Sequence, residues 1–181
     1  NKIILVFGGT SGIGKSVVLS LSKKNAKKIY AISRDPKKFI NPPKNVNLVK
    51  LDVLDEKKLQ SFLKNLGKYD ILVNAATGGE RAIGPFQSMD LEAYRNSFKK
   101  LWGYTNTVRL GLATLSKSGC IVLVSGSPAR RGKPGQIALA SVGGSVEAFS
   151  KTLASEIKPI RINIVSPGVI DTPMSPLKGT E

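Results

Sequence analysis

The chain has 181 residues, of which 41% are hydrophobic, so it is long enough to bury a sizeable core as one domain over residues 1–181. Lysine and arginine outnumber aspartate and glutamate by 28 to 12, which gives a formal net charge of +16. The sequence has no histidine, the commonest general base and metal ligand, so metal catalysis and serine-histidine hydrolysis are disfavoured. One cysteine excludes an internal disulfide and fits a reducing compartment.

The basic residues are spread along the chain, many as lysine pairs, with no basic stripe interleaved with aromatic residues. This distribution is typical of a solvated surface, so nucleic acid is a less favoured partner, although such a surface attracts polyanions at low salt. No stretch approaches the ~20 apolar residues that span a bilayer, and the N-terminus lacks a signal-peptide pattern. We therefore expect a cytoplasmic protein without a membrane partner.

Apolar runs typical of buried strands alternate with amphipathic helical patterns along the chain. In chain order they predict a strand at 3–7, a helix at about 13–24, strands at 29–33 and 46–51, a helix at about 54–66, a strand at 71–74, a helix at about 91–115, a strand at 121–125, a helix at about 138–157 and a strand at 161–165. Repeated units of this kind predict an α/β fold: a doubly wound parallel sheet, Rossmann-like, with helices on both faces. Such a fold holds its ligand at the carboxyl ends of the strands, where the strand order reverses.

A glycine-rich turn joins the first predicted strand to the first helix. The order strand, glycines, helix is the one that a dinucleotide site requires. Absent side chains at Gly8, Gly12 and Gly14 allow a tight turn and let backbone N–H groups approach an anion, whose charge the helix N-terminus favours. We therefore expect the pyrophosphate of a dinucleotide on Gly8, Thr10, Ser11, Gly12, Ile13 and Gly14.

The end of the second strand indicates which dinucleotide binds. A carboxylate at this place would bind the ribose 2′-hydroxyl of NAD, whereas an arginine accommodates the 2′-phosphate of NADP. The chain has Ser33 and Arg34 here, and a guanidinium beside a hydroxyl suits a phosphate. NADP(H) is therefore the expected cofactor and NAD(H) the less favoured one, with the neighbouring Asp35 arguing slightly against this choice.

Two motifs make the chain resemble the short-chain dehydrogenase/reductase family. One is the Gly-x-x-x-Gly-x-Gly spacing of the first turn, and the other is the Pro-Gly-x-x-x-Thr segment after the last strand. The resemblance covers nearly the whole chain and implies that Asp52 and Val53 contact the adenine ring, although the position of Asp52 also fits a simple helix cap. The loop Asn74, Ala75 and Ala76, where the family has Asn-Asn-Ala-Gly, would line the cofactor, and the Asn74 amide can tie neighbouring strands together.

The Pro-Gly segment is implied by the resemblance to run along the nicotinamide. Its carboxamide would bond to the backbone of Val169 or Ile170 and to the hydroxyl of Thr172. The segment assigned to the cofactor consists of Pro167, Gly168, Val169, Ile170 and Thr172.

The family's catalytic residues are absent from the matching positions of this chain. In the family the tyrosine of a Tyr-x-x-x-Lys motif donates the proton, and that lysine, a serine after the fifth strand and a helical asparagine assist it. The resemblance places Leu139 at the tyrosine, Gly143 at the lysine, Gly126 at the serine, and Lys100 or Leu101 at the asparagine. Leucine and glycine cannot donate a proton, so the usual mechanism is excluded.

Three functions stay open. The first is an NADP(H)-dependent oxidoreductase that acts on an unidentified carbonyl or alcohol substrate, with Lys100 as the acid once desolvation lowers its pKa. Its candidate assistants are Ser125, Ser127, Ser141 and Tyr104, of which Tyr104 follows Lys100 by four residues and can share its helix face. The second is a catalytically inactive NADP-binding sensor or scaffold, and the third is a basic nucleic-acid-associated protein.

Quaternary structure and chain completeness follow from the same resemblance. In the family the helices that match 91–115 and 138–157 pair between subunits, which implies a homodimer or homotetramer. Family members continue past the Pro-Gly segment into a region that covers the substrate, whereas this sequence ends at Glu181 and does not begin with methionine. We expect either a chain that is incomplete at its C-terminus or one that lacks the substrate lid.

Overall fold

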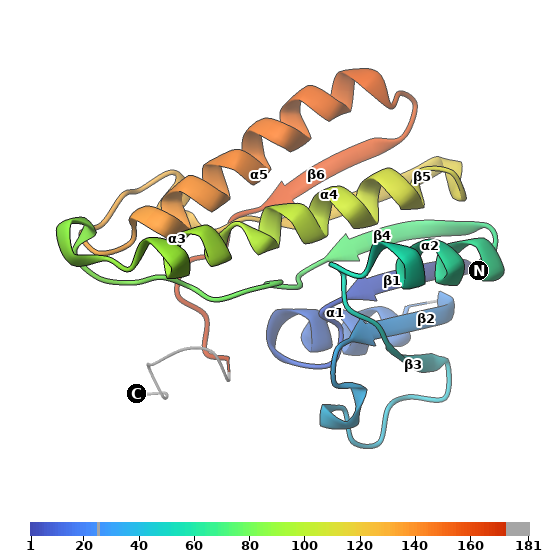
Figure 1. The fold of residues 1–181 in the computed structure, drawn as a ribbon. Helices are drawn as coiled ribbons and strands as arrows, with labels where there is room; N and C mark the ends of the chain where they lie inside the picture. The colour runs from blue at the N-terminus through green and yellow to red at the C-terminus, as the bar shows by residue number, and fades with distance from the viewer. Residues whose placement is uncertain (25, 173–181) are drawn as a thin grey trace.

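The computed structural model of the chain describes residues 1–24 and 26–172. Within these residues one parallel sheet has the strand order β3-β2-β1-β4-β5-β6 (Figure 1). The strands are β1 (Lys2–Phe7), β2 (Ala26–Ser33), β3 (Val46–Lys50), β4 (Tyr69–Asn74), β5 (Leu115–Val124) and β6 (Arg161–Val165). The order reverses between β1 and β4, as in a doubly wound fold, so the predicted fold class is confirmed.

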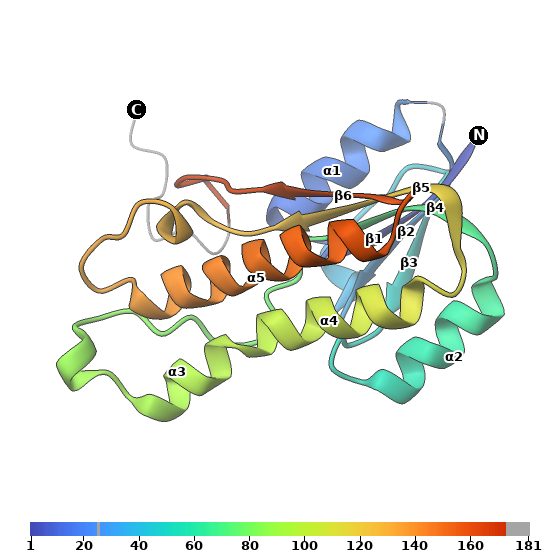
Figure 2. The same cartoon turned by 90° about the horizontal axis from the view of Figure 1, so that it is seen from above.

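Helices cover both faces of the sheet, with α1 on one side and α2, α4 and α5 on the other (Figure 2). The helices are α1 (Gly12–Ser22), α2 (Glu56–Leu66), α3 (Leu91–Ser97), α4 (Lys99–Gly111) and α5 (Ile137–Glu156), with 3-10 turns at Pro36–Lys38, Phe86–Ser88 and Ser127–Ala129. Successive strand residues face opposite sides. Ile4 and Val6 therefore pack with α1, whereas Leu5 and Phe7 pack in the core under α2, α4 and α5.

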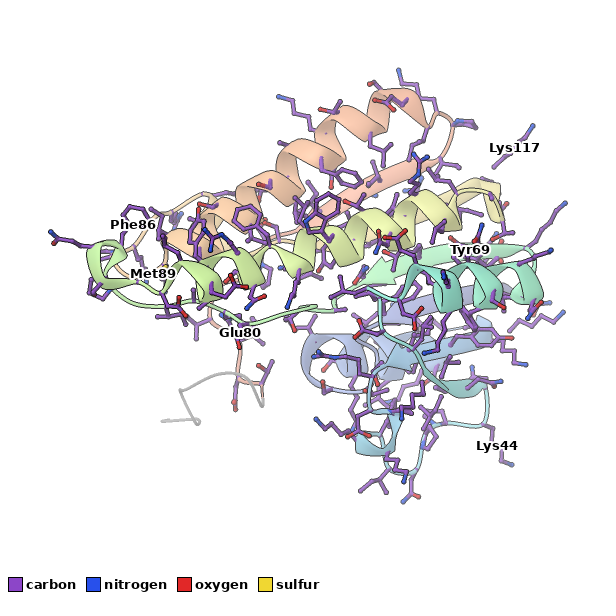
Figure 3. All side chains as sticks on the ribbon, viewed as in Figure 1. Lys44, Tyr69, Glu80, Phe86, Met89 and Lys117 are labelled. Atoms are coloured by element: carbon purple, nitrogen blue, oxygen red, sulfur yellow. The ribbon has the colours of Figure 1, made fainter. Side chains whose placement is uncertain are left out.

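The single helix predicted at 91–115 is wrong, because the structure divides it into α3 and α4 at Phe98. The loop after β4 presses on this junction: a Cβ on Gly78 would lie 2.6 Å from the carbonyl oxygen of Lys99. The helix also ends earlier than predicted. The buried Tyr69 (labelled in Figure 3) donates a hydrogen bond of 3.0 Å to the carbonyl oxygen of Gly111, which closes α4.

Candidate functional site

The glycine turn after β1 forms a closely packed cradle at the switch point of the sheet. Gly8 has a φ of +75°, and a Cβ there would lie 2.8 Å from the carbonyl carbon of Ala75. A Cβ on Gly14 would overlap the carbonyl group of Gly8. A side chain at either position would therefore push the turn away from the β4 loop or from α1.

The N-terminus of α1 is open toward an anion. Ser11 is exposed and makes no side-chain capping bond within the described residues, and the first turn of α1 contains no acidic residue. Gly12, which begins the helix, has a φ of +48°. The free N–H groups of this first turn and the glycine cradle fit the pyrophosphate of a dinucleotide.

The end of β2 is tied to the same turn. The buried Thr10 donates a hydrogen bond of 2.8 Å from Oγ1 to the Oγ of Ser33. Arg34 follows, exposed, and lines a pocket of about 420 Å³. The pocket is lined by Arg34, Asp52, Leu54, Gly78, Gly79, Glu80, Asn96 and Lys99.

Asp52 is not the cap of α2. It accepts a hydrogen bond of 3.0 Å from the N–H of Leu54, whereas Asp55 caps the helix by accepting one from the N–H of Lys58. The carboxylate of Asp52 is left at the pocket wall. The side chain of Val53 is buried against α4, so only its backbone is in a position to meet a ligand.

Asn74 does not tie neighbouring strands together, contrary to the prediction. Its buried amide donates a hydrogen bond of 2.7 Å to Thr107 on α4, and its Oδ1 accepts one of 3.0 Å from the N–H of Ala76. It therefore fastens β4 to α4 and shapes its own loop. The N–H of Ala75 donates to the carbonyl oxygen of Phe7 at 2.9 Å, which holds this loop against the glycine turn.

The Pro-Gly segment leaves β6 and reaches the start of α1. The carbonyl oxygen of Pro167 accepts a hydrogen bond of 2.8 Å from the N–H of Ser127. Gly168, Val169 and Ile170 are exposed, and a Cβ on Gly12 would lie 3.4 Å from the Cβ of Thr172. The segment therefore spans the carboxyl edge between β6 and the glycine turn.

Lys100 projects from α4 to the carboxyl end of β5. Its Nζ donates a hydrogen bond of 3.0 Å to the carbonyl oxygen of Ser125 and lies 5.5 Å from the centre of the Tyr104 ring. Burial, with a smaller contribution from the positive charge of Arg81, lowers the pKa of Lys100 to about 8. Lys100 and Tyr104 thus share a helix face, as predicted.

Tyr104 itself has no access to a ligand. Its ring is fully buried, its hydroxyl donates to the carbonyl oxygen of Val124 at 3.0 Å, and burial raises its pKa above the ordinary range for tyrosine. A proton-donating role is therefore not compatible with its position. Tyr104 instead provides an aromatic face beside the Lys100 ammonium, where a cation is stabilised.

The three candidate serines have different surroundings. The buried Ser125 donates from Oγ to the carbonyl oxygen of Gly143 at 3.1 Å, and Ser141 accepts a hydrogen bond of 3.1 Å from the hydroxyl of Tyr94. Ser127 is half-buried in the turn after β5, and its hydroxyl has no partner among the described residues. Ser127 is therefore the serine that is free to meet a ligand.

The space beside Gly143 is filled by the chain itself. A Cβ on Gly143 would lie 2.9 Å from the Cβ of Ala129 and 3.1 Å from the Oγ of Ser125. The loop after β5 therefore packs against α5 at the place where the resemblance puts a lysine.

A polar cluster beside the site was missed by the sequence analysis. Glu147 accepts a hydrogen bond of 2.7 Å from Ser166 and is paired with the Nε of Arg130 at 3.1 Å. The bond from Ser166, followed by Arg130, lowers the pKa of Glu147. The three residues come from α5, from the segment that follows β6 and from the loop after β5, and no sequence pattern links them.

Two further absences concern the described residues alone. No group of three or more histidine, cysteine, aspartate or glutamate side chains in 1–24 and 26–172 is placed to hold a metal ion. Over the same residues, every helix is too short or too polar to cross a membrane.

Comparison with known proteins gives consistent matches over almost the whole chain. The family model for the short chain dehydrogenases matches residues 2–180. L-xylulose reductase from Bos taurus is 32% identical over 179 residues, which cover 94% of this chain and 72% of that protein. Carbonyl reductase family member 4 from Xenopus tropicalis is 32% identical over 186 residues, covering 96% of this chain and 78% of the relative. A short chain dehydrogenase from Burkholderia cenocepacia, solved in complex with NADP, superposes with a TM-score of 0.88 at 25% identity, over 97% of this chain and 76% of that one.

Proposed function

The chain belongs to the short chain dehydrogenase family, and we propose that it is an NADP(H)-dependent oxidoreductase in which Lys100 takes the role of proton donor. The observation that carries this proposal is the position of the Lys100 ammonium, 3.0 Å from the carbonyl oxygen of Ser125 at the carboxyl end of β5. This end of the sheet is where a doubly wound fold binds its ligand.

NADP(H) fits the residues that surround the switch point. The cradle of Gly8, Gly12 and Gly14 would hold the pyrophosphate, and Arg34 beside Ser33 would hold the 2′-phosphate. The solved relative from Burkholderia cenocepacia, which is in complex with NADP, supports the same choice. When bound, NADPH would supply the hydride that reduces a carbonyl carbon.

The reduction also needs a proton for the carbonyl oxygen. With a pKa of about 8, the Lys100 ammonium is a strong enough acid to deliver that proton near neutral pH and is left as a neutral amine. The Ser125 carbonyl and the Tyr104 ring fix its direction, and the hydroxyl of Ser127 is available to bond the same substrate oxygen.

The test begins with binding, because a failed activity screen would only mean that the wrong substrate was offered. Calorimetric titration at physiological ionic strength is expected to show that NADPH binds with micromolar affinity and that NADH binds more weakly. Arg34→Ala should lower the affinity for NADPH and leave the affinity for NADH unchanged. Equal losses of affinity for the two nucleotides would refute the role of Arg34. A folded protein that bound neither nucleotide would contradict the proposal and favour a scaffold or a nucleic-acid-associated protein. Binding to nucleic acid would be recognised by an affinity that falls steeply with salt concentration.

A catalytically inactive NADP-binding sensor or scaffold is the second candidate. It is favoured by Gly143, where close contacts with Ala129 and Ser125 leave no room for the family's lysine. This candidate predicts NADPH binding without turnover against a broad panel of aldehydes and ketones. Turnover that disappears on replacement of Lys100 would exclude it.

A homodimer or homotetramer is the quaternary structure that we propose from the family resemblance, with α4 and α5 as the pairing helices. Trp102 on α4 is 62% exposed, and Phe149 and Leu153 line a shallow groove on α5. Light scattering of the purified protein would measure the mass directly. Trp102→Glu should dissociate such an assembly, and a wild-type monomer would refute it.

A further inference from the structure

We propose that Lys99, the first residue of α4, is a second cation for the 2′-phosphate of NADP(H) and so contributes to the choice between NADPH and NADH. This inference rests on the proposed cofactor but assigns a residue of a helix that the sequence analysis did not connect with the adenosine end.

The pocket at the carboxyl edge brings Lys99 and Arg34 together. Arg34 comes from the loop after β2 and Lys99 from the start of α4, and both line the same cavity of about 420 Å³. A cavity of this volume is within the range of small-molecule sites. Asp52, the expected adenine contact, lines the same cavity, which places the adenosine end of the cofactor here.

The absence of a side chain at Gly79 makes room for the side chain of Lys99. A Cβ on Gly79 would lie 2.9 Å from the Cβ and 3.2 Å from the Cδ of Lys99, so the stem of the lysine lies against the glycine. Adjacent helix residues point about 100° apart. Lys99 therefore lines the pocket, whereas Lys100 is directed to the carbonyl oxygen of Ser125.

The charges of the pocket match a ligand that has both an amino group and a phosphate. The carboxylate of Asp52 can accept a hydrogen bond from the adenine amino group. Arg34 and Lys99 form no ion pair within the described residues, so both are free to bind an anion. Glu80, which also lines the pocket, opposes anion binding, and two cations together offset its charge better than Arg34 alone.

The experiment compares two probes that differ only in the 2′-phosphate, adenosine 2′,5′-bisphosphate and adenosine 5′-monophosphate. Their affinities are measured by calorimetry on the full chain at physiological ionic strength, for the wild type, Lys99→Gln and Lys117→Gln. Lys117 is exposed at the start of β5, far from Glu80 at the pocket (Figure 3), so its variant loses the same charge elsewhere. Circular dichroism confirms that both variants are folded.

Lys99→Gln is expected to lower the affinity for the bisphosphate by about three- to tenfold and the affinity for the monophosphate by less than about twofold. Lys117→Gln should bind both probes with an affinity close to that of the wild type. An unchanged bisphosphate affinity, equal losses for the two probes, or the same loss in Lys117→Gln would overturn the role of Lys99. If any of these results were found while the wild-type protein still bound NADPH, the role of Lys99 would fail and the proposed function would stand. Wild-type protein that bound neither probe nor NADPH would overturn both.

Discussion

The ammonium of Lys100 lies 3.0 Å from the carbonyl oxygen of Ser125, so a cation carried by α4 reaches the carboxyl end of β5. The resemblance puts the family's lysine at Gly143 on α5, where a Cβ would crowd Ala129 and Ser125. We propose that Lys100 brings the positive charge to this end of the sheet from α4 instead. This relationship makes Lys100 the residue whose removal distinguishes an enzyme from a binding protein.

Lys100→Met should lower the rate of carbonyl reduction by about 100-fold or more, since a positioned proton donor typically contributes a factor of that size. NADPH affinity should stay close to wild type, because Lys100 faces Ser125 rather than the glycine turn. In the wild type, kcat/KM for reduction should fall above about pH 8, where the ammonium loses its proton. Steady-state kinetics against pH measures both effects.

Lys117→Met is the matched control for this variant, because it removes an exposed lysine from the opposite end of β5. It should retain the wild-type rate and pH profile. Retained turnover in Lys100→Met would show that another group donates the proton.

The buried position of Lys100 should also make stability depend on pH. Its pKa is lowered from 10.5 to about 8 in the folded protein, whereas the unfolded chain keeps the ordinary value. Between about pH 8 and 10.5 the unfolded state binds more protons, so the free energy of unfolding rises with pH in this window and the destabilisation is fully present below it.

Urea denaturation of wild type and Lys100→Met isolates this effect from the other lysines. The stability of the wild type relative to Lys100→Met should increase between about pH 7.5 and pH 10. A difference that stayed constant over this range would mean that Lys100 keeps a normal pKa, and the acid role near neutral pH would then lose its support.

The sequence predicts the parts of this fold that depend on local pattern. The strand at 161–165 coincides with β6, and the glycine turn lies where β1 meets α1, because alternating apolar runs and glycine spacing are local signals. The break at Phe98 and the bond from Asn74 to α4 escape prediction. Both depend on contacts between segments distant in the chain, which periodicity does not contain.

The candidate site shows the same division. Arg34 is predictable because it follows a strand in a known order, and Lys100 because the resemblance places it at or next to the family's asparagine, whereas Lys99 belongs to a lysine pair that resembles any solvated surface. Only the packing of Gly79 against Lys99 and the bond from Lys100 to Ser125 give the two lysines separate directions.

Gly12→Val should abolish NADPH binding without unfolding the protein. Gly12 has a φ of +48°, which a β-branched residue rarely adopts, and its side chain would project toward Thr172 over the start of α1. Calorimetry should show NADPH affinity reduced by more than about tenfold, with a cooperative unfolding transition retained. Unchanged affinity would remove the pyrophosphate from this turn.

Gly67→Val is the control for backbone strain. Gly67 has a φ of +74° at the end of α2, and a Cβ there has no neighbour within 4 Å. The variant should lose stability through its backbone conformation while binding NADPH as the wild type does. Equal losses of affinity in both variants would attribute the effect of Gly12→Val to general destabilisation.

Two adjacent glycines in α5 should respond in opposite ways to the same substitution. Gly144→Ala should stabilise the protein by up to about 1 kcal/mol, because a Cβ there meets nothing within 4 Å and alanine is the better helix former. Gly143→Ala should destabilise it by about 1–3 kcal/mol, since its Cβ would crowd Ala129 at 2.9 Å and Ser125 at 3.1 Å. Urea denaturation of the two variants measures the contrast.

The same crowding determines what Gly143→Lys can do. A lysine has the Cβ of alanine and a longer stem, so it must displace the loop that carries Ser125, whose carbonyl oxygen holds Lys100. The double change Leu139→Tyr with Gly143→Lys, which restores the family's residue types, should therefore fail to raise turnover and should be less stable than Leu139→Tyr alone. A gain in reductase activity from the double change would show that the loop can move to accommodate a lysine. Close packing at Gly143 would then not explain why the lysine is absent.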